Sequence, residues 1–134
     1  MKNGLIRESL RIAREKHKNH PQIHYWPHYS FIVQNNKLIE WAYNHTDTPP
    51  IHMGYHKRIN WGVPKTHSEL AAWRAAKGLL NQNKNFEIIN IRLNRKGELR
   101  NSQPCVCCYD FLKSMGCNNC IFSIDNGWAR LKIV

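Results

Sequence analysis

Two short groups of metal-binding residue types stand where the chain begins a helix. His67 and Glu69 open a helical run in "KTHSELAAWRAAKG", and Cys105 and Cys108 open another in "PCVCCYDFLKSMG". Cysteines three apart in a first helical turn can turn both sulfurs to one point, where the helix dipole favours the thiolates that zinc requires. A histidine from a second helix start gives three protein ligands, which leaves a fourth position for water, as in catalytic zinc sites. A fold that uses this site must bring two helix starts together.

The first group also has an ordinary interpretation. Thr66 and Glu69 have the T-x-x-E spacing of a capping box, in which the two side chains bind free backbone N–H groups at a helix start. Glu69 can therefore be a capping residue or a catalytic one, and the two roles exclude each other only in part.

Hydrophobic periodicity and turn residues divide the remaining sequence into alternating elements. The predicted elements are a basic amphipathic helix over 4–18, a β-hairpin over 28–44 that turns at Asn35 and Asn36, an irregular loop over 45–64, a helix over 67–80, a strand over 86–93, a helix over 105–115, a strand over 119–124, and a strand or short helix over 129–134. Strands that alternate with helices after an opening hairpin indicate an α/β protein with a layered sheet.

Length and composition restrict the class of protein. A chain of 134 residues with 42% hydrophobic and 22% charged residues is expected to form one globular domain. The first twenty residues have no continuous apolar stretch, so we expect no signal peptide or membrane span, and a cytoplasmic protein. Five cysteines without an export signal favour metal binding or burial over disulfides. A net charge of +11 favours polyanionic partners such as nucleic acid.

The combination of H-x-E with P-C-x-x-C is the signature of zinc-dependent nucleobase deaminases. The chain resembles the cytidine and deoxycytidylate deaminase superfamily over roughly residues 28–124: "HYSFIVQNNKLIEWAYNHT" resembles the opening hairpin of that family, which ends in a pair such as Tyr43-Asn44. The resemblance implies a three-layer α/β/α sandwich with a mixed sheet of about five strands. It implies a single domain over 1–134, with a basic helix and loop over 1–27 and the deaminase core over 28–124.

The resemblance also implies roles for individual residues. His67, Cys105 and Cys108 are the expected ligands of one zinc ion, Glu69 is the expected proton shuttle, and Asn44 is expected to bind the sugar or base. Further candidate substrate contacts are Tyr29, Ser68, Ser102, Trp26, Trp61, Lys57 and Arg58. Trp26 and Trp61 are candidates for base stacking because they lie in predicted loops beside basic residues. The sequence departs from the family at Tyr29 and Ser30, where small residues are usual, and at Ser68, where alanine is usual.

The implied reaction is hydrolytic deamination of cytosine to uracil. The +11 charge, the basic first helix and the basic loop "GYHKRINWG" favour single-stranded DNA or RNA as the substrate over a free nucleotide or cytidine. A transfer-RNA adenosine deaminase and a non-catalytic nucleic-acid-binding module are further alternatives. No oligomeric state is predicted.

The non-catalytic alternative uses the cysteines differently. Cys105, Cys108, Cys117 and Cys120 have the C-x2-C spacing of a four-cysteine structural zinc site. If 109–115 is helical, however, the two pairs lie roughly 10 to 14 Å apart, too far for one metal. Buried free thiols are therefore expected at the second pair, and Cys107 is expected to be a packing residue. The histidines at 17, 20, 24 and 28 are interrupted by prolines and are expected to be solvated or stacked.

Overall fold

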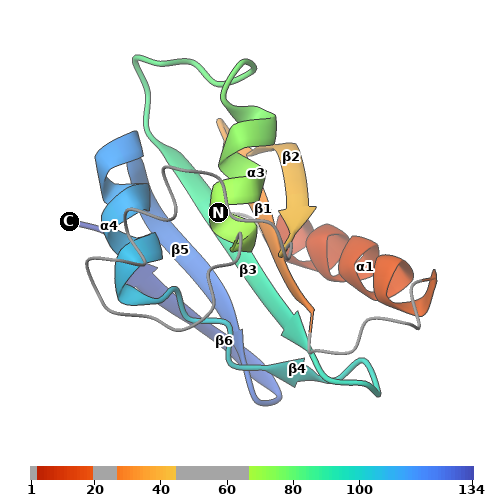
Figure 1. Cartoon of the computed structure of the whole chain (residues 1–134). Helices are drawn as coiled ribbons and strands as arrows, with labels where there is room; N and C mark the ends of the chain where they lie inside the picture. Colours follow the sequence, from red (N-terminus) through yellow and green to blue (C-terminus); the bar gives the residue numbers. More distant parts are fainter. Residues whose placement is uncertain (1–2, 20–26, 45–66) are drawn as a thin grey trace.

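A mixed sheet of six strands with three helices forms the part of the chain that a computed structural model describes, residues 3–19, 27–44 and 67–134 (Figure 1). The elements are α1 (Asn3–Asn19), β1 (His28–Gln34), β2 (Lys37–Tyr43), α3 (Ser68–Ala76), β3 (Phe86–Leu93), β4 (Leu99–Arg100), α4 (Val106–Met115), β5 (Cys117–Ile124) and β6 (Gly127–Lys132). The strand order is β2-β1-β3-β5-β6, and β4 pairs with β3 at one end. Only β3 and β5 are parallel among these pairs.

The sheet lies between two helical layers, as the sequence predicted. On one face Ala13 of α1 packs in a buried cluster with Phe31 and Ile89. On the other face Ala72 of α3 and Leu112 of α4 pack in a second cluster with strand residues such as Ile32. Successive strand residues point to opposite faces, so each central strand contributes to both clusters. Figure 1 shows α3 and α4 on the near face of the sheet and α1 behind it.

The opening hairpin turns where its sequence predicted. Asn35 and Asn36 connect β1 to β2, and both have positive φ, at 57° and 59°. Two successive residues with positive φ define the type I′ turn, whose twist matches that of paired strands. The hairpin sets β2 as an edge strand and places β1 next to β3.

A crossover connection positions both helix starts at one end of the sheet. The chain leaves the carboxyl end of β3, passes through β4 and α4, and returns as β5, parallel to β3. In Figure 1, α3 and α4 both begin toward the end of the sheet where β3 ends, and rise along the same face. Open sheets of this kind bind ligands at the carboxyl ends of their parallel strands.

Several boundaries differ from the predicted ones. The helix expected over 67–80 ends at Ala76 and continues as a turn, and the segment 129–134 contributes to strand β6. The two-residue strand β4 was not predicted because so short a strand has no measurable alternation. The loop predicted over 45–64 and residues 20–26 lie outside the described residues. No helix in the described part of the chain is long and apolar enough to cross a membrane.

Candidate active site

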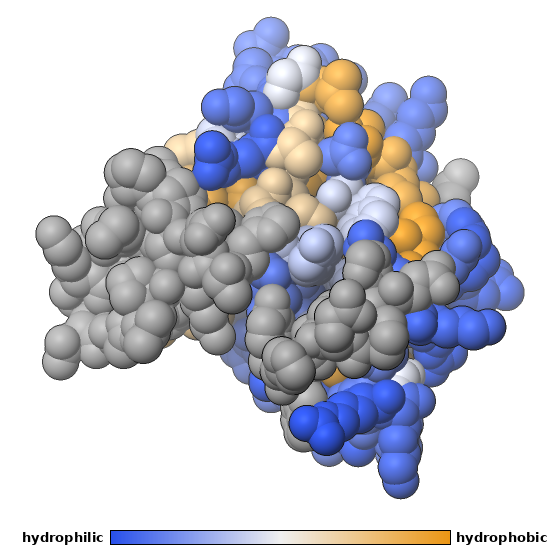
Figure 2. Space-filling view, turned by 45° about the vertical axis from the view of Figure 1, so that its right-hand side comes forward, coloured by the Kyte–Doolittle hydropathy of each residue, from blue (hydrophilic) through white to orange (hydrophobic). Residues whose placement is uncertain are grey.

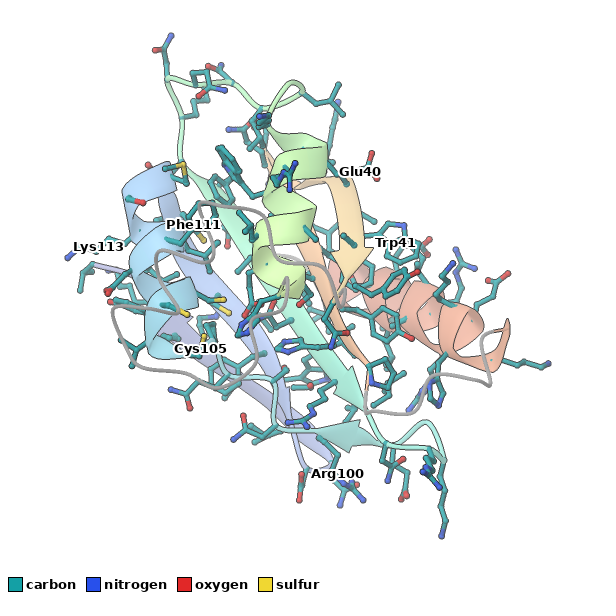
Figure 3. The ribbon with its side chains drawn as sticks, viewed as in Figure 1. Glu40, Trp41, Arg100, Cys105, Phe111 and Lys113 are labelled. Carbon is teal, nitrogen blue, oxygen red and sulfur yellow. The ribbon has the colours of Figure 1, made fainter. Side chains whose placement is uncertain are left out.

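The starts of α3 and α4 bring three potential metal ligands together. His67 is the N-cap residue of α3, and Cys105 is the N-cap residue of α4. His67 Nδ1 lies 3.5 Å from Cys105 Sγ and 3.2 Å from Cys108 Sγ, and the three ligand atoms lie within 4.8 Å of one another. Figure 3 shows Cys105 at the end of α4 that lies nearest the first turn of α3. The structure thus places His67, Cys105 and Cys108 as the sequence predicted.

The spacing of these atoms fits a zinc ion. Tetrahedral coordination, with zinc–sulfur bonds of about 2.3 Å and zinc–nitrogen bonds of about 2.0 to 2.1 Å, separates a sulfur and a nitrogen ligand by about 3.5 Å. Both measured sulfur–nitrogen distances are close to that value. Two thiolates and one imidazole are also the donor types that zinc prefers. The described residues therefore fit a three-ligand zinc site.

The thiols influence one another's ionisation. The pKa of Cys105 is lowered, first by a hydrogen bond with the Cys108 thiol and then by contacts with His67 and the Cys108 backbone N–H. Hydrogen bonds with Cys108 and then Cys105 lower the pKa of Cys107 to about 7. The pKa of Cys108 is raised well above its ordinary value, because it shares hydrogen bonds with both neighbours and is fully buried. Cys105 is therefore the sulfur that ionises most readily beside His67.

Glu69 is a buried carboxylate next to this group. Its side chain is 1% exposed and follows His67 by two residues on α3. Burial raises the pKa of this carboxyl, but the charges of His28 and His67, its own backbone N–H and a hydrogen bond from Asn90 outweigh burial, so the pKa is lowered overall. The structure thus favours an ionised Glu69.

Besides its own backbone N–H, two side chains lie next to the carboxylate. Asn90 Nδ2 donates to Glu69 Oε2 at 3.0 Å, and Ser68 Oγ lies 3.3 Å from Oε1. Glu69 is the second residue of a helix that begins at Ser68, whereas a capping box places it third. Thr66, the other member of the predicted capping box, lies outside the described residues.

Asn44, the expected contact to sugar or base, lies at the same end of the sheet. Its Oδ1 accepts a hydrogen bond from the His28 backbone N–H at 3.2 Å, and its own N–H donates to the His28 carbonyl at 3.1 Å. Asn44 is therefore fixed beside His28, the residue whose charge acts most strongly on Glu69. Its binding of a substrate stays a prediction.

The other candidate substrate contacts lie in different places. Ser68 and Ser102 are buried, and each hydroxyl bonds within the protein, that of Ser102 with the Asn90 carbonyl at 2.9 Å. Tyr29 is fully buried on the opposite face of the sheet, where its ring packs near Trp41. Tyr29 and Ser30 are neighbours on a strand, so only one of them can face the site. Lys57, Arg58, Trp26 and Trp61 lie outside the described residues.

The four-cysteine site is not formed. Cys117 and Cys120 on β5 are part of the buried apolar cluster under α3 and α4. Burial raises the pKa of Cys117 to about 12, and it raises the pKa of Cys120 well above the ordinary value. Among the described residues, the group able to hold a metal contains His67, Cys105 and Cys108 and neither β5 cysteine. These two cysteines are buried thiols, as their sequence context predicted.

Two residues near Glu69 were missed by the sequence analysis. His28 was expected to be solvated or stacked, but its charge acts on the buried carboxylate. Asn90 was counted only as part of the strand "FEIINIRL", although it is fully buried and binds Glu69. A single amide in the middle of an apolar strand was the available signal, because a buried polar side chain requires a partner.

Comparison with known proteins confirms the expected fold. No protein-family model matches the chain, and no curated protein matches it. Among solved structures, the dCMP deaminase from the cyanophage S-TIM5 in complex with dCMP and dUMP is similar, with a TM-score of 0.56 and 14% sequence identity over 91% of this chain and 82% of that chain. The apo form of that enzyme has a TM-score of 0.50 and 12% identity, over 91% and 84% of the two chains. The chain therefore has the fold of a dCMP deaminase.

Proposed function

We propose that this protein is a zinc-dependent deaminase that hydrolyses cytosine to uracil and releases ammonia. The observation that carries the proposal is the convergence of His67, Cys105 and Cys108 next to the buried carboxylate of Glu69, in a fold shared with dCMP deaminases. Each of these residues has the type and place that the deaminase signature requires.

Glu69 carries the proton transfers in this reaction. His67, Cys105 and Cys108 would hold a zinc ion, which would lower the pKa of a bound water to about 7. The Glu69 carboxylate accepts one proton of the attacking water and delivers it to the ring nitrogen of cytosine. It then takes the second water proton from the new hydroxyl on the ring carbon and gives it to the amine, which leaves as ammonia while the carbonyl of uracil forms. A carboxylate with a lowered pKa is in the correct state to accept the first proton. Glu69 is therefore again ionised at the end of each catalytic cycle.

For the substrate, we propose a cytosine base in single-stranded nucleic acid. Support comes from a basic area formed where α1 meets the turn between β3 and β4. Arg14 Nε donates to the Gly97 carbonyl, at 3.4 Å, and a His17 ring nitrogen lies 3.3 Å from the Arg95 carbonyl. These contacts bring the basic end of α1 next to Arg95 and Lys96, which are exposed. Figure 2 shows one face of the molecule, on which hydrophilic residues lie around a hydrophobic area.

A free cytosine nucleotide is the second candidate substrate. One of the similar structures is a dCMP deaminase described in complex with dCMP and dUMP. A nucleotide needs only a few cationic residues for its phosphate, so the same site could serve it without the basic area.

Uracil formation measured by mass distinguishes these substrates. Zinc-loaded protein and the Glu69→Ala variant are incubated with dCMP, CMP, deoxycytidine and a cytosine-containing single-stranded oligonucleotide. We expect turnover of the oligonucleotide by the native protein, and a variant that retains one zinc per chain but loses turnover. Turnover of dCMP alone would assign the enzyme to free nucleotides. Full activity of Glu69→Ala, or no turnover of any substrate, would refute the proposed function.

A further inference from the structure

Three polar side chains form a buried network under the candidate site. Ser30 on β1, Ser68 on α3 and Asn90 on β3 each have 0% exposure. Ser30 and Asn90 are direct partners in the antiparallel pairing of β1 with β3, so both side chains point to the same face of the sheet. We call these three residues the serine–asparagine network. They lie beneath the first turn of α3, which carries Glu69.

The hydrogen bonds of this network have a fixed direction. Ser30 Oγ donates to Asn90 Oδ1 at 2.7 Å, which uses the single proton of that hydroxyl. The 2.7 Å contact between Ser30 Oγ and Ser68 Oγ must then have Ser68 as its donor. The series therefore runs from Ser68 through Ser30 to the amide oxygen of Asn90.

The orientation of the Asn90 amide follows from its other partners. Asn90 Nδ2 lies 3.2 Å from the Ser102 carbonyl oxygen, which can only accept, and 3.0 Å from Glu69 Oε2. Both protons of the amide nitrogen are therefore used in hydrogen bonds. If the amide were flipped, its oxygen would face these two acceptor oxygens and could bond to neither. Its donor is thus held against the carboxylate by two further hydrogen bonds, with Ser30 and with the Ser102 carbonyl.

The serines that orient Asn90 are also departures from the related family. Alanine is usual at the position of Ser68 and small residues are usual at that of Ser30, and the two hydroxyls bind each other in this structure. The contact between Ser68 Oγ and Glu69 Oε1, at 3.3 Å, is longer than an ordinary O–H···O bond. The Asn90 bond is therefore the better of these two restraints on the carboxylate.

We propose that Asn90 is a positioning residue for Glu69, and that Ser30 and Ser68 act through it by fixing the orientation of its amide. This inference rests on the proposed function, because it assigns Asn90 to the proton transfers of Glu69. Rotation of the carboxylate would leave a fully buried amide N–H without its acceptor, so the network restricts Glu69 to one orientation. Asn90 is fully buried, so its proposed role is exerted through Glu69.

The kinetic test compares Asn90→Leu with Ser30→Ala and a control. Ser123→Ala is the matched control, because Ser123 is also fully buried and its hydroxyl is hydrogen-bonded with Ser102 and the Arg100 carbonyl rather than with Glu69. With the best substrate of the native protein, we expect kcat of Asn90→Leu to fall about 100-fold. KM and zinc content of Asn90→Leu should stay within about threefold of the native values. The kcat of Ser30→Ala should fall about tenfold, and that of Ser123→Ala less than about threefold.

A double-mutant cycle tests the contact without enzyme activity. The unfolding constants of native protein, Asn90→Leu, Glu69→Ala and the double variant are measured in urea. We expect the double variant to deviate about fivefold from the product of the single effects, and the cycle of Ser123→Ala with Glu69→Ala to stay within about twofold. If Asn90→Leu does not fold, Asn90→Ala replaces it, because this smaller side chain lacks the amide donor and adds no charge beside Glu69.

The two measurements separate failure of this inference from failure of the proposed function. Equal kcat losses in Asn90→Leu and Ser123→Ala, or a rise in KM in place of the loss in kcat, would overturn the positioning role. An additive cycle would overturn it as well. If native protein converts no substrate, both the proposed function and the positioning role fail. A non-additive double-mutant cycle would then show only that the contact between Asn90 and Glu69 stabilises the fold.

Discussion

At the scale of single residues, the five cysteines divide into two chemical groups. Cys105, Cys107 and Cys108 lie at the start of α4, where hydrogen bonds lower the pKa of the first two. Cys117 and Cys120 lie in the apolar cluster, where burial raises the pKa of both. Only a thiolate reacts with an alkylating reagent or binds a metal. Cys105 should therefore be more reactive than Cys117 and Cys120 by orders of magnitude, and more reactive than Cys108, whose pKa is also raised.

Thiol alkylation of the folded, zinc-free protein tests this division. A pKa of about 12 leaves only about one Cys117 thiol in ten thousand ionised at pH 8, and the ionised fraction rises tenfold per pH unit up to the pKa. We therefore expect iodoacetamide at pH 8 to modify Cys105, which is partly exposed, within minutes and to leave the buried Cys117 and Cys120 unmodified. Peptide mass mapping gives the sites.

Zinc provides the control for this labelling. Metal at the site should protect Cys105 and Cys108, and denatured protein should label at all five cysteines. Labelling of Cys117 at the rate of Cys105 in folded protein would contradict the buried assignment.

The sequence was sufficient to predict which three candidate ligands would converge, but not which side chains would support the site. Ligand type, spacing and helix starts are local features, so His67, Cys105 and Cys108 could be read directly. The hydrogen bond from Asn90 to Glu69 depends on β1 pairing with β3 in one register, which places Ser30 opposite Asn90. A register of this kind joins residues distant in the sequence, and no local pattern specifies it.

At the scale of elements, glycine ends the helix that carries two ligands. Gly116 follows α4 with φ of 96°, in the left-handed region, and its N–H donates to the carbonyls of Leu112 and Lys113. This αL residue turns the chain directly into β5, which starts at Cys117. The position of α4 on the sheet depends on this turn.

Gly116→Ala should therefore destabilise the protein. A Cβ at this glycine meets no atom within 4 Å, so the cost comes from the backbone conformation, about 1 to 2 kcal/mol in the free energy of unfolding. Urea denaturation measures it. Gly78→Ala is the matched control, because that glycine also has open space but no positive φ, and it should change stability little. Equal effects at both glycines would contradict the backbone explanation.

Element types were more predictable than element ends. The strand over 86–93 and the hairpin turn at Asn35 and Asn36 agree with the structure because alternation and turn residues are strong local signals. The helix predicted to 80 stops at Ala76, and the chain continues as a turn that contains Gly78.

At the scale of the whole molecule, the question is whether one basic area or the overall positive charge would bind nucleic acid. Arg95 and Lys96 lie in the turn that contacts the basic end of α1. Lys37 and Lys84 are exposed at the opposite end of β1, near Gln34. Reversing either pair changes the net charge equally, so the two double variants separate local charge from overall charge.

The variant Arg95→Glu with Lys96→Glu should bind a single-stranded oligonucleotide more weakly than Lys37→Glu with Lys84→Glu. If Arg95 and Lys96 each contact a phosphate, the slope of log K against log salt should fall in magnitude by about 1.4, since single strands release about 0.7 counterion per contact. Fluorescence anisotropy over a series of salt concentrations measures it. Equal losses in both variants would indicate that only overall charge matters.

The origin of the metal ligands in two different helices also has a consequence for synthesis of the protein. His67 comes from the start of α3, whereas Cys105 and Cys108 come from the start of α4, after the central strand β3 has been made. A growing chain cannot hold a metal with all three ligands until the ribosome has released the second group and both helices have packed on the sheet. Uptake of a metal by all three ligands would therefore be a late event in the life of each new molecule, and a bound ion would mark a chain whose two helices have already packed on the sheet.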